Sequence, residues 1–354
     1  MSDRYERSTY ISYYWKGNVT ENESVFPLES RDGHLHDIAL MYPADEILEV
    51  RSSDLATLYT EGKDYILHEG KLRILPDGAI PTVPYDGYFF KEKPADVAGA
   101  PTAFPCRFGG YIFFAEKDGM HVRQISVSYR HSAEWNGPVP EAKGGLLPKT
   151  LAKLEAGESL KVLVYGDSIS TGANSTKRVD AAPYAETWFD MLVGTLAEKY
   201  SAPIELVNTA VGGTATGWGL ENAKELAADH KPDLAIIGFG MNDGSGRISV
   251  ENYIKRTVGI MNCIREQNPN VEFILISTMM PHAIVAHFLG NQEEYLPELM
   301  KLEGEACAIA NVTDMHKHLL ARKRYYDMSG NNVNHPNDFL ARLYAQVLLR
   351  TLEK

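Results

Sequence analysis

Two patterns of hydrophobic and polar residues divide the chain. From about residue 160 onward, short apolar runs alternate with longer segments in which apolar residues recur at helical spacing. The apolar runs lie at 162–165, 204–207, 234–237 and 273–276. The helices that we predict lie at 184–200, 220–229, 250–266, 295–308 and 339–352. Strands that alternate with helices in this way predict a parallel, doubly wound α/β sheet buried on both faces.

The first half of the chain shows short β-branched or alternating segments separated by turn signals. We predict strands at 47–50, 65–68, 72–75, 111–115 and 121–129. Short strands with frequent turns are typical of an all-β sandwich. Residues 135–157 contain several prolines and indicate a linker with a short helix at 149–154. The sequence therefore predicts a jelly-roll-like β-sandwich domain with its linker over 1–155 and an α/β domain over 156–354.

Composition and charge exclude several functional classes. The chain has 354 residues and a net charge of −12, which argues against nucleic acid and anionic membranes as partners, since both require a basic face. No apolar run reaches the length of a membrane span. The N-terminus is charged and leads into no apolar segment, so we expect no signal peptide and a cytoplasmic location. The three cysteines are far apart, which favours free thiols over a disulfide or metal framework.

Polar clusters follow the predicted strands and precede the last helix. They are 166–168 (Gly-Asp-Ser), 208–214, 238–244 and 331–338. In open α/β sheets, ligands bind at the carboxyl ends of the strands, next to the point where the strand order reverses. If the strand order is flavodoxin-like, these four clusters meet in one crevice.

The residues in these clusters fit acyl transfer. Ser168 is a candidate nucleophile, and His335 is a candidate base for its hydroxyl. A tetrahedral intermediate also needs hydrogen-bond donors at its oxyanion. The Ser168 amide, an amide at Gly212 or Gly213 and the side chain of Asn242 are candidates for this role.

Taken together, these motifs resemble the SGNH (GDSL) hydrolase superfamily over residues 160–354. The resemblance implies that Ser168 is the nucleophile and that His335 is the base. It also implies that Ser168, Gly213 and Asn242 form the oxyanion hole. The α/β-hydrolase motif Gly-x-Ser-x-Gly does not fit, because Ser170 occupies the position of its second glycine.

One position departs from the family pattern. Three residues before the histidine the family usually carries aspartate, whereas this chain has Asn332. Our leading interpretation is a Ser–His dyad whose histidine is oriented by Asn332 or by a backbone carbonyl. Two alternatives are that Asp327 or Asp338 supplies the carboxylate, and that activity is impaired.

Other polar and aromatic residues have weaker assignments. Three of them could line a substrate cleft, although packing roles fit each as well: Trp218, Tyr184 and His282. Asp167 and Asp243 lie in the motifs, where we expect them to bind turn amides. The pairs His34/His36 and His316/His318 have ligand-like spacing without accompanying cysteines or carboxylate pairs, so we expect surface or packing histidines.

The sequence thus predicts a serine esterase that hydrolyses small acyl esters through an acyl-enzyme. The resemblance to two-domain carbohydrate esterases implies an acetyl ester on a carbohydrate, so the expected partner is a small-molecule or oligosaccharide ester. No metal and no organic cofactor is implied, and a homo-oligomer stays open. Two alternatives remain: a lipid or thioester acylhydrolase, and a catalytically impaired carbohydrate-binding protein.

Overall fold

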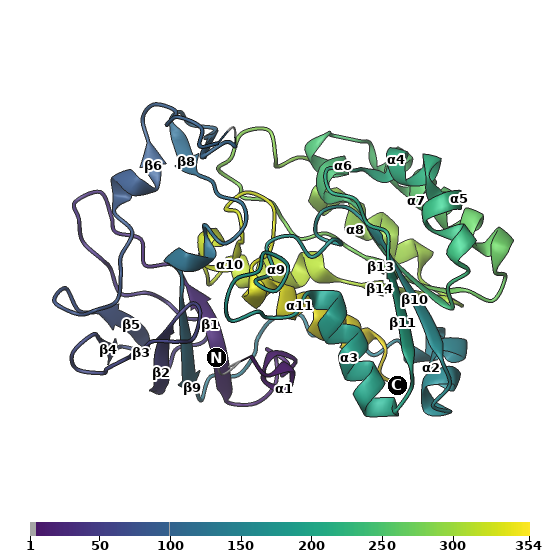
Figure 1. Cartoon of the computed structure of the whole chain (residues 1–354), viewed down its shortest axis with the longest axis horizontal. Coiled ribbons are helices and arrows are strands. Elements are labelled where there is room, and N and C mark those ends of the chain that lie inside the picture. Colours follow the sequence, from purple (N-terminus) through teal and green to yellow (C-terminus); the bar gives the residue numbers. More distant parts are fainter. Residues whose placement is uncertain (1–4, 99) are drawn as a thin grey trace.

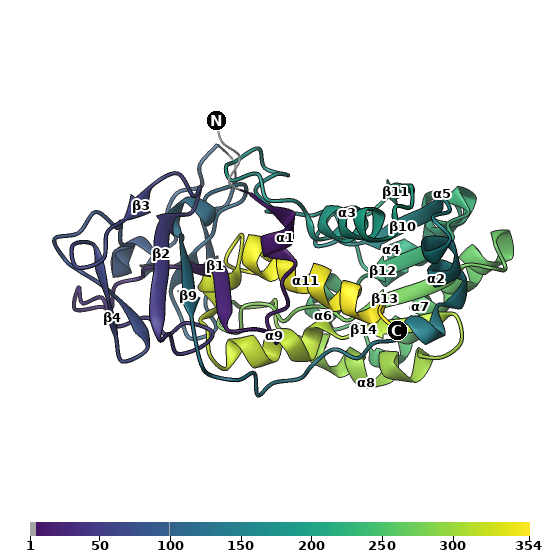
Figure 2. The same cartoon turned by 90° about the horizontal axis from the view of Figure 1, so that it is seen from below.

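The computed structural model describes residues 5–98 and 100–354. Figure 1 shows the N-terminal β-rich part on the left and the α/β part on the right. The last helix, α11 (Asp338–Thr351), lies between the two parts in Figure 1 and in the perpendicular view of Figure 2. Among the described residues, no helix is long and apolar enough to cross a bilayer.

The N-terminal part consists of antiparallel strands, as the sequence predicted. Within the described residues, four strands form one sheet in the order β1-β9-β2-β3, three form another in the order β6-β8-β7, and β4 pairs with β5. The bounds are β1 Val19–Val25, β2 Glu46–Ser52, β3 Leu58–Tyr59, β4 Tyr65–His68, β5 Lys71–Ile74, β6 Phe89–Phe90, β7 Ala103–Pro105, β8 Tyr111–Phe113 and β9 Ile125–Arg130. The jelly-roll-like arrangement and the boundary at residue 155 stay predictions.

The C-terminal part is built on a parallel sheet, which confirms the predicted α/β class. Its strands, in the described part of the chain, follow the order β11-β10-β12-β13-β14. Their bounds are β10 Leu160–Gly166, β11 Ile204–Asn208, β12 Leu234–Gly238, β13 Glu272–Ile276 and β14 Cys307–Ala310. The first strand of this domain lies second in the sheet, which is the flavodoxin-like order, so the strand order reverses next to β10.

Alternating residues of the parallel strands bury both faces of the sheet. Val162 and Val164 of β10 belong to one hydrophobic cluster, whereas Leu163 and Tyr165 belong to another. Helices cover both faces, as right-handed crossovers require. Their bounds are α2 Pro148–Glu155, α3 Trp188–Tyr200, α4 Thr216–Glu221, α5 Ala223–Leu226, α6 Met241–Ser245, α7 Val250–Gln267, α8 Tyr295–Leu299, α9 Val312–Leu320 and α10 Tyr325–Met328.

The predicted helix over 295–308 is wrong. The structure has the short helix α8 there, a 3₁₀ turn (Met300–Leu302) and then the edge strand β14. Residues 306–310 read Ala-Cys-Ala-Ile-Ala. Periodicity alone does not separate a buried strand of this kind from a buried helix.

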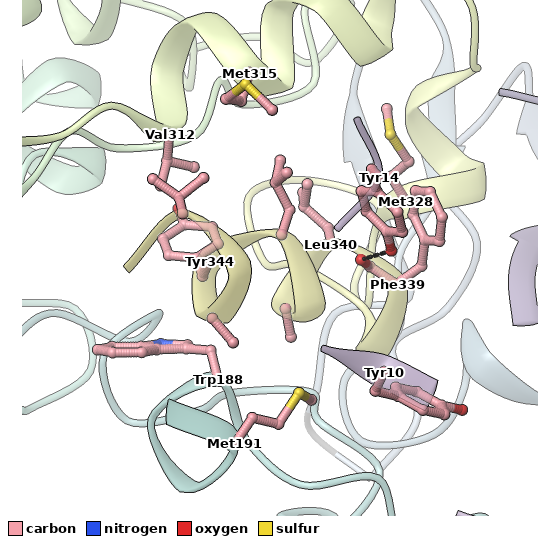
Figure 3. Packing of buried hydrophobic residues seen from close by; sticks show 14 of the residues in the cluster. Tyr10, Tyr14, Trp188, Met191, Val312, Met315, Met328, Phe339, Leu340 and Tyr344 are labelled. Carbon is pink, nitrogen blue, oxygen red and sulfur yellow. Dashed lines mark hydrogen bonds between the residues drawn. The ribbon is translucent and has the colours of Figure 1, made fainter. Parts of the chain in front are cut away.

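The N-terminal segment packs on α11 and ties the two parts together (Figure 3). The Tyr14 hydroxyl donates to the Phe339 carbonyl at 2.7 Å, and the two rings stack with centroids 4.7 Å apart. Arg342 of α11, although 2% exposed, donates to the carbonyls of Tyr10 and Glu21. The β-rich part and the α/β part therefore share one core, and segments of the β-rich part are held in fixed positions near the sheet.

Candidate active site

The loops that follow three neighbouring strands leave the parallel sheet at the same edge. Strand β10 pairs with β11 on one side and with β12 on the other, with Val164 opposite Asn208 and Gly166 opposite Gly238. The loops after these strands carry Ser168, residues 208–214 and Asn242. This edge is where an open α/β sheet binds its ligand.

Ser168 lies in a tight turn directly after β10. A Cβ atom added at Gly166 would lie 2.3 Å from the Gly238 carbonyl oxygen, so only glycine allows this approach between the strand ends. The Thr171 amide donates to the carbonyls of Asp167 and Ser168, which closes the turn. Ser168 is 8% exposed, so its hydroxyl is held in one place while it stays accessible.

His335 lies next to the Ser168 hydroxyl, with its Nε2 atom 2.8 Å from Ser168 Oγ. The loop around the histidine is held by Asn331, whose Oδ1 accepts from the amides of Val333, Asn334 and His335. The histidine and the serine are thus within the range for direct proton transfer. Burial lowers the pKa of His335 below its ordinary value, which favours the neutral imidazole that can act as a base.

The group that orients His335 is Asn174, not Asn332. Asn174 Oδ1 lies 2.6 Å from His335 Nδ1. Asn174 has φ of +63°, a left-handed conformation that asparagine tolerates better than most residues. It packs tightly against the histidine loop, because a Cβ added at Gly330 would lie 2.5 Å from Asn174 Cβ.

Asn332 points away from His335. Its Oδ1 accepts from the Tyr88 hydroxyl at 2.9 Å and its Nδ2 donates to the Phe113 carbonyl at 2.6 Å. Both partners belong to the β-rich part. The prediction that Asn332 orients the histidine is therefore wrong, because Asn332 instead ties the histidine loop to β8 and to the residue before β6.

The two aspartates that were considered as substitutes are also engaged elsewhere. Asp327 accepts from the Phe26 amide and pairs with Arg324. Asp338 accepts from the amide and hydroxyl of Thr176. Neither carboxylate therefore replaces the missing family aspartate.

The hydrogen bonds of Asn174 determine the tautomer of His335. Asn174 Nδ2 donates to the Lys117 carbonyl at 3.0 Å, and a carbonyl can only accept. The amide oxygen of Asn174 must then face His335 Nδ1, so Nδ1 carries the proton of the neutral ring. Nε2 is left with its lone pair toward the Ser168 hydroxyl, which is the state that a general base needs.

A carboxylate of the β-rich part also lies near the histidine. Glu116, in the loop after β8, has Oε2 3.8 Å from His335 Nδ1, and its side chain is 49% exposed. Its negative charge raises the pKa of His335 and so opposes the larger, lowering effect of burial. The Glu116 Oε1 atom accepts from Asn331 Nδ2 at 3.4 Å.

The predicted oxyanion donors lie around the serine. Gly212 is beside it, since an added Cβ there would lie 3.7 Å from Ser168 Cβ. Gly213 has φ of +78°, and both glycines are exposed. Asn242 Nδ2 donates one hydrogen to the Thr214 carbonyl at 2.8 Å, which leaves its second hydrogen available. The roles of Ser168, Gly213 and Asn242 as oxyanion donors stay predictions.

The two motif aspartates support the turns. Asp167 accepts from the Ile169 amide, and burial raises its pKa to about 7. Asp243 accepts from the amide and hydroxyl of Thr216, which fixes the start of α4 relative to α6. Both contacts agree with the prediction that these carboxylates bind local groups.

The three predicted cleft residues have different surroundings. Tyr184 is 40% exposed, in the segment that follows Asn174. Trp218 is half-buried and packs near Tyr165 in the core under α4, with ring centroids 6.3 Å apart. His282 is buried, its Nδ1 lies 2.9 Å from the Asn332 carbonyl oxygen, and burial lowers its pKa to about 4. His282 therefore supports the histidine loop from within, which differs from the predicted contact with substrate.

Comparison with known proteins places this geometry in a family. The model of the GDSL-like lipase/acylhydrolase family matches residues 164–343, which is half of the chain. The chain belongs to this family. The matched region contains the serine, the histidine, Asn174 and Asn242, whereas Glu116 lies outside it.

Relatives of this family member include an arylesterase of Vibrio mimicus. It is 29% identical over 118 residues, which cover 33% of this chain and 55% of the arylesterase. The chain thus spans about half the length of the curated relative that it matches. A two-domain esterase active on acetylated mannans, solved with mannopentaose, is 19% identical with a TM-score of 0.48, covering 60% of this chain and 54% of that one. An acetyl xylan esterase variant from Geobacillus stearothermophilus is 16% identical with a TM-score of 0.43, covering 55% and 94%.

The described residues of this acylhydrolase-family chain contain no group of three or more histidine, cysteine, aspartate or glutamate side chains placed to hold a metal ion. Of the histidine pairs with ligand-like spacing, His316 is buried and accepts from the Met280 amide, whereas His318 packs on Trp135. His34 and His36 lie edge to face. These contacts agree with packing and surface roles.

Sequence reasoning missed two residues that contact the histidine. Asn174 lies six positions after the serine, in a loop without a recognisable pattern. Glu116 lies in the other half of the chain, and nothing in its local sequence points to the site. Only the three-dimensional packing of the two parts brings Glu116 and Asn174 to His335.

Proposed function

We propose that this protein is a serine esterase that hydrolyses short acyl esters through an acyl-enzyme. The observation that carries the proposal is the 2.8 Å contact between Ser168 Oγ and His335 Nε2. The orientation of Asn174 supports it, because this orientation leaves the lone pair of Nε2 facing the serine.

In the first step, His335 Nε2 takes the proton of the Ser168 hydroxyl as Oγ attacks the ester carbonyl. A bond forms between Oγ and the carbonyl carbon, and the carbonyl π electrons move onto its oxygen. The amides of Ser168 and Gly213 and the free hydrogen of Asn242 Nδ2 are proposed to bind that oxyanion. Each donor of this kind typically contributes about 10²–10³ in rate.

In the second step, the imidazolium gives its proton to the leaving alkoxide oxygen, and the bond between that oxygen and the acyl carbon breaks. An acyl group stays on Ser168. Water then attacks the acyl-enzyme with His335 again as base, which releases the carboxylic acid and restores the hydroxyl. The neutral histidine needed at the start of each half-reaction is favoured by its burial.

The finer proposal is an acetyl ester carried by a carbohydrate. It rests on the sequence resemblance to two-domain carbohydrate esterases, and the surroundings of the serine agree with it. The loop over 208–214 reads Asn-Thr-Ala-Val-Gly-Gly-Thr and offers little apolar surface for a long acyl chain. A cavity of about 440 Å³ borders the turn after the serine and has mainly polar walls, formed by Thr171, Lys177, Arg178, Thr187, Phe189, Asp190, Asn208 and Ala210. Such walls suit the hydroxyl groups of a sugar.

The first test is turnover of p-nitrophenyl acetate by the wild type and by Ser168→Ala. We expect a loss of at least about 10³-fold in kcat, as for other serine nucleophiles. Ser12→Ala, at an exposed serine far from the sheet edge in sequence, is the matched control and should retain full activity. A fluorophosphonate probe followed by mass spectrometry should label Ser168. Equal rates for wild type and Ser168→Ala would refute the esterase proposal.

The second test addresses the substrate. In a series of p-nitrophenyl esters from acetate to octanoate, we expect kcat/KM to fall with chain length; a rise would favour the lipid or thioester acylhydrolase. Arg178→Ala should raise KM for acetylated xylo- and manno-oligosaccharides while it leaves p-nitrophenyl acetate unaffected. Binding of oligosaccharides without turnover of any ester would favour the impaired carbohydrate-binding protein. The cytoplasmic location and a homo-oligomeric state stay predictions.

A further inference from the structure

The catalytic geometry lacks a negative charge at the atom where the family usually places one. Asn174 fixes the orientation of the His335 ring, but a neutral amide does not balance the positive charge of the imidazolium that forms during acyl transfer. In the described part of the chain, Glu116 is the carboxylate that lies within ion-pair distance of the ring, 3.8 Å from Nδ1. Glu116 belongs to the β-rich part and lies outside the region that the family model matches.

The loop that carries Glu116 is fixed against the histidine loop by several contacts. The Lys117 carbonyl accepts from Asn174 Nδ2, and Glu116 Oε1 accepts from Asn331 Nδ2. The turn is tight, since a Cβ added at Gly119 would lie 2.4 Å from Ala115 Cβ. These contacts join the glutamate to the two asparagines that position the histidine side chain and its backbone.

Packing on both sides of this loop also holds it in place. Phe114 and Met120, which flank the loop, are buried in a cluster together with Val333 of the histidine loop. The Phe113 carbonyl accepts from Asn332, one residue before Val333. The two loops therefore form one packed unit although they come from opposite halves of the chain.

We propose that Glu116 is a positioning residue of the acyl-transfer site, which stabilises the His335 imidazolium from the β-rich part in place of the family's aspartate. This inference rests on the proposed esterase function. It also gives the β-rich part a direct role in the chemistry: Glu116 supplies a charge, and Lys117 supplies the carbonyl that fixes the Asn174 amide.

The other charged groups around the histidine leave this role to Glu116. Asp338 and Asp327, on α11 and α10, are buried in contacts with Thr176 and Arg324. Asp167 lies under the serine turn, and His282, behind the loop, has a pKa lowered by burial and stays neutral near pH 7. Lys117 is exposed next to Glu116.

The test is Glu116→Gln, which removes the charge and keeps an oxygen to accept from Asn331. Because the pair is half-exposed, we expect a fall in kcat of about threefold to tenfold, with KM nearly unchanged. The acidic limb of the kcat/KM profile should move to lower pH, since loss of a neighbouring negative charge lowers the pKa of His335. Raising the ionic strength should reduce the activity of the wild type toward that of the variant and leave the variant unaffected.

The matched control is Asp118→Asn, which removes one negative charge from the same exposed loop without a contact to the histidine. It should leave the kcat and the pH profile unchanged. Equal effects of Glu116→Gln and Asp118→Asn, or no effect of either, would overturn the proposal.

A second measurement separates this proposal from the esterase proposal. The imidazole of His335 can be titrated by NMR in the Ser168→Ala background, where no turnover is needed. Glu116→Gln should lower the pKa of His335 in that background, and Asp118→Asn should not. A shift without measurable esterase activity would support the contact with Glu116 and count against the esterase function, whereas esterase activity without a shift would do the reverse.

Discussion

Asn174 and His335 form a 2.6 Å hydrogen bond between Oδ1 and Nδ1, and the same Asn174 amide donates to the Lys117 carbonyl of the β-rich part. A residue of the α/β part thus depends on a backbone atom from the other half of the chain for its orientation. Because Asn174 sets the tautomer of the histidine, the β-rich part takes part in preparing the base.

Asn174→Ala should therefore impair catalysis more than binding. The change removes the acceptor at Nδ1, and a hydrogen bond to a group that becomes charged is worth about 1.5–3 kcal/mol, or about tenfold to 150-fold in rate. We expect kcat for p-nitrophenyl acetate to fall within this range while KM changes little. A change in KM alone would contradict the assigned role.

Asn174→Asp provides the companion measurement. A carboxylate at this position raises the pKa of His335, so the acidic limb of the pH profile should move upward, opposite to the effect of Glu116→Gln. The new carboxylate also faces the Lys117 carbonyl without a hydrogen to donate, so its folded state should be less stable than that of the wild type. A downward shift of the acidic limb would contradict this account.

The fold was largely predictable because the parallel strands obey a simple rule. Strands such as β10 and β12 are short apolar runs followed by glycine, and helices such as α7 and α11 carry the helical period within a residue of the predicted bounds. The edge strand β14 was missed because its small residues continue the pattern of the helix before it. Strand β1 was missed because its sequence, Val-Thr-Glu-Asn-Glu-Ser-Val, is mostly polar and is buried by the other part of the chain.

The site was predictable only where it follows the strands. Ser168, Asn242 and the glycines at 212 and 213 are fixed by the strand ends, and the motif at His335 lies directly before α11. The partner of the histidine was not predictable from spacing. Asn332 has φ of +71°, and this left-handed turn directs its side chain to Tyr88 and Phe113. Residues that contact the site across the two parts, Glu116 above all, carry no local signal.

The buried histidines predict how stability depends on pH. Burial lowers the pKa of His282 to about 4 and that of His316 to about 3, against an ordinary value of 6.5. The unfolded chain therefore binds more protons than the folded chain below about pH 6.5. The stability is fully present above that pH and falls as the pH decreases toward 4, by about 1.4 kcal/mol per pH unit for each histidine. Urea denaturation at pH 7, 6 and 5 measures this slope.

His282→Asn isolates one contribution to the slope. The asparagine amide can still donate to the Asn332 carbonyl, but it does not titrate, so the dependence on pH should become shallower. His287→Asn is the matched control, because this histidine is exposed and its left-handed φ of +71° suits asparagine. The same slope in the wild type and His282→Asn would mean that His282 is not kept neutral by the fold.

Asn332→Asp should destabilise the protein rather than improve its base. Asn332 is fully buried, and its Nδ2 donates to the Phe113 carbonyl. An aspartate would place a carboxylate oxygen against that carbonyl, and such a buried unsatisfied group costs about 1–3 kcal/mol, more when it is charged. Asn270→Asp, at an exposed position, should change the free energy of unfolding by less than about 0.5 kcal/mol. Unchanged stability together with higher activity would restore Asn332 as the orienting residue.

Lys323 and Glu23 form an ion pair in which both side chains are fully buried, between the segment before α10 and strand β1. Glu23 also accepts from the Met41 amide and the Tyr129 hydroxyl, and Lys323 donates to the Ser24 carbonyl. Lys323→Met should lower the free energy of unfolding by about 3–5 kcal/mol, because it leaves a carboxylate buried without its counter-charge.

The double variant Lys323→Met/Glu23→Gln distinguishes this cause from lost packing. It removes both charges and keeps an oxygen at residue 23 to accept hydrogen bonds, so it should regain part of the lost stability. Lys301→Met is the matched surface control, since its pair with Glu298 is exposed and worth about 0–1 kcal/mol. Thermal and urea denaturation of the four proteins measures these differences. If the single and double variants were equally destabilised, the unpaired charge would not be the cause, and the packing of the lysine stem on Phe339 would be the remaining explanation.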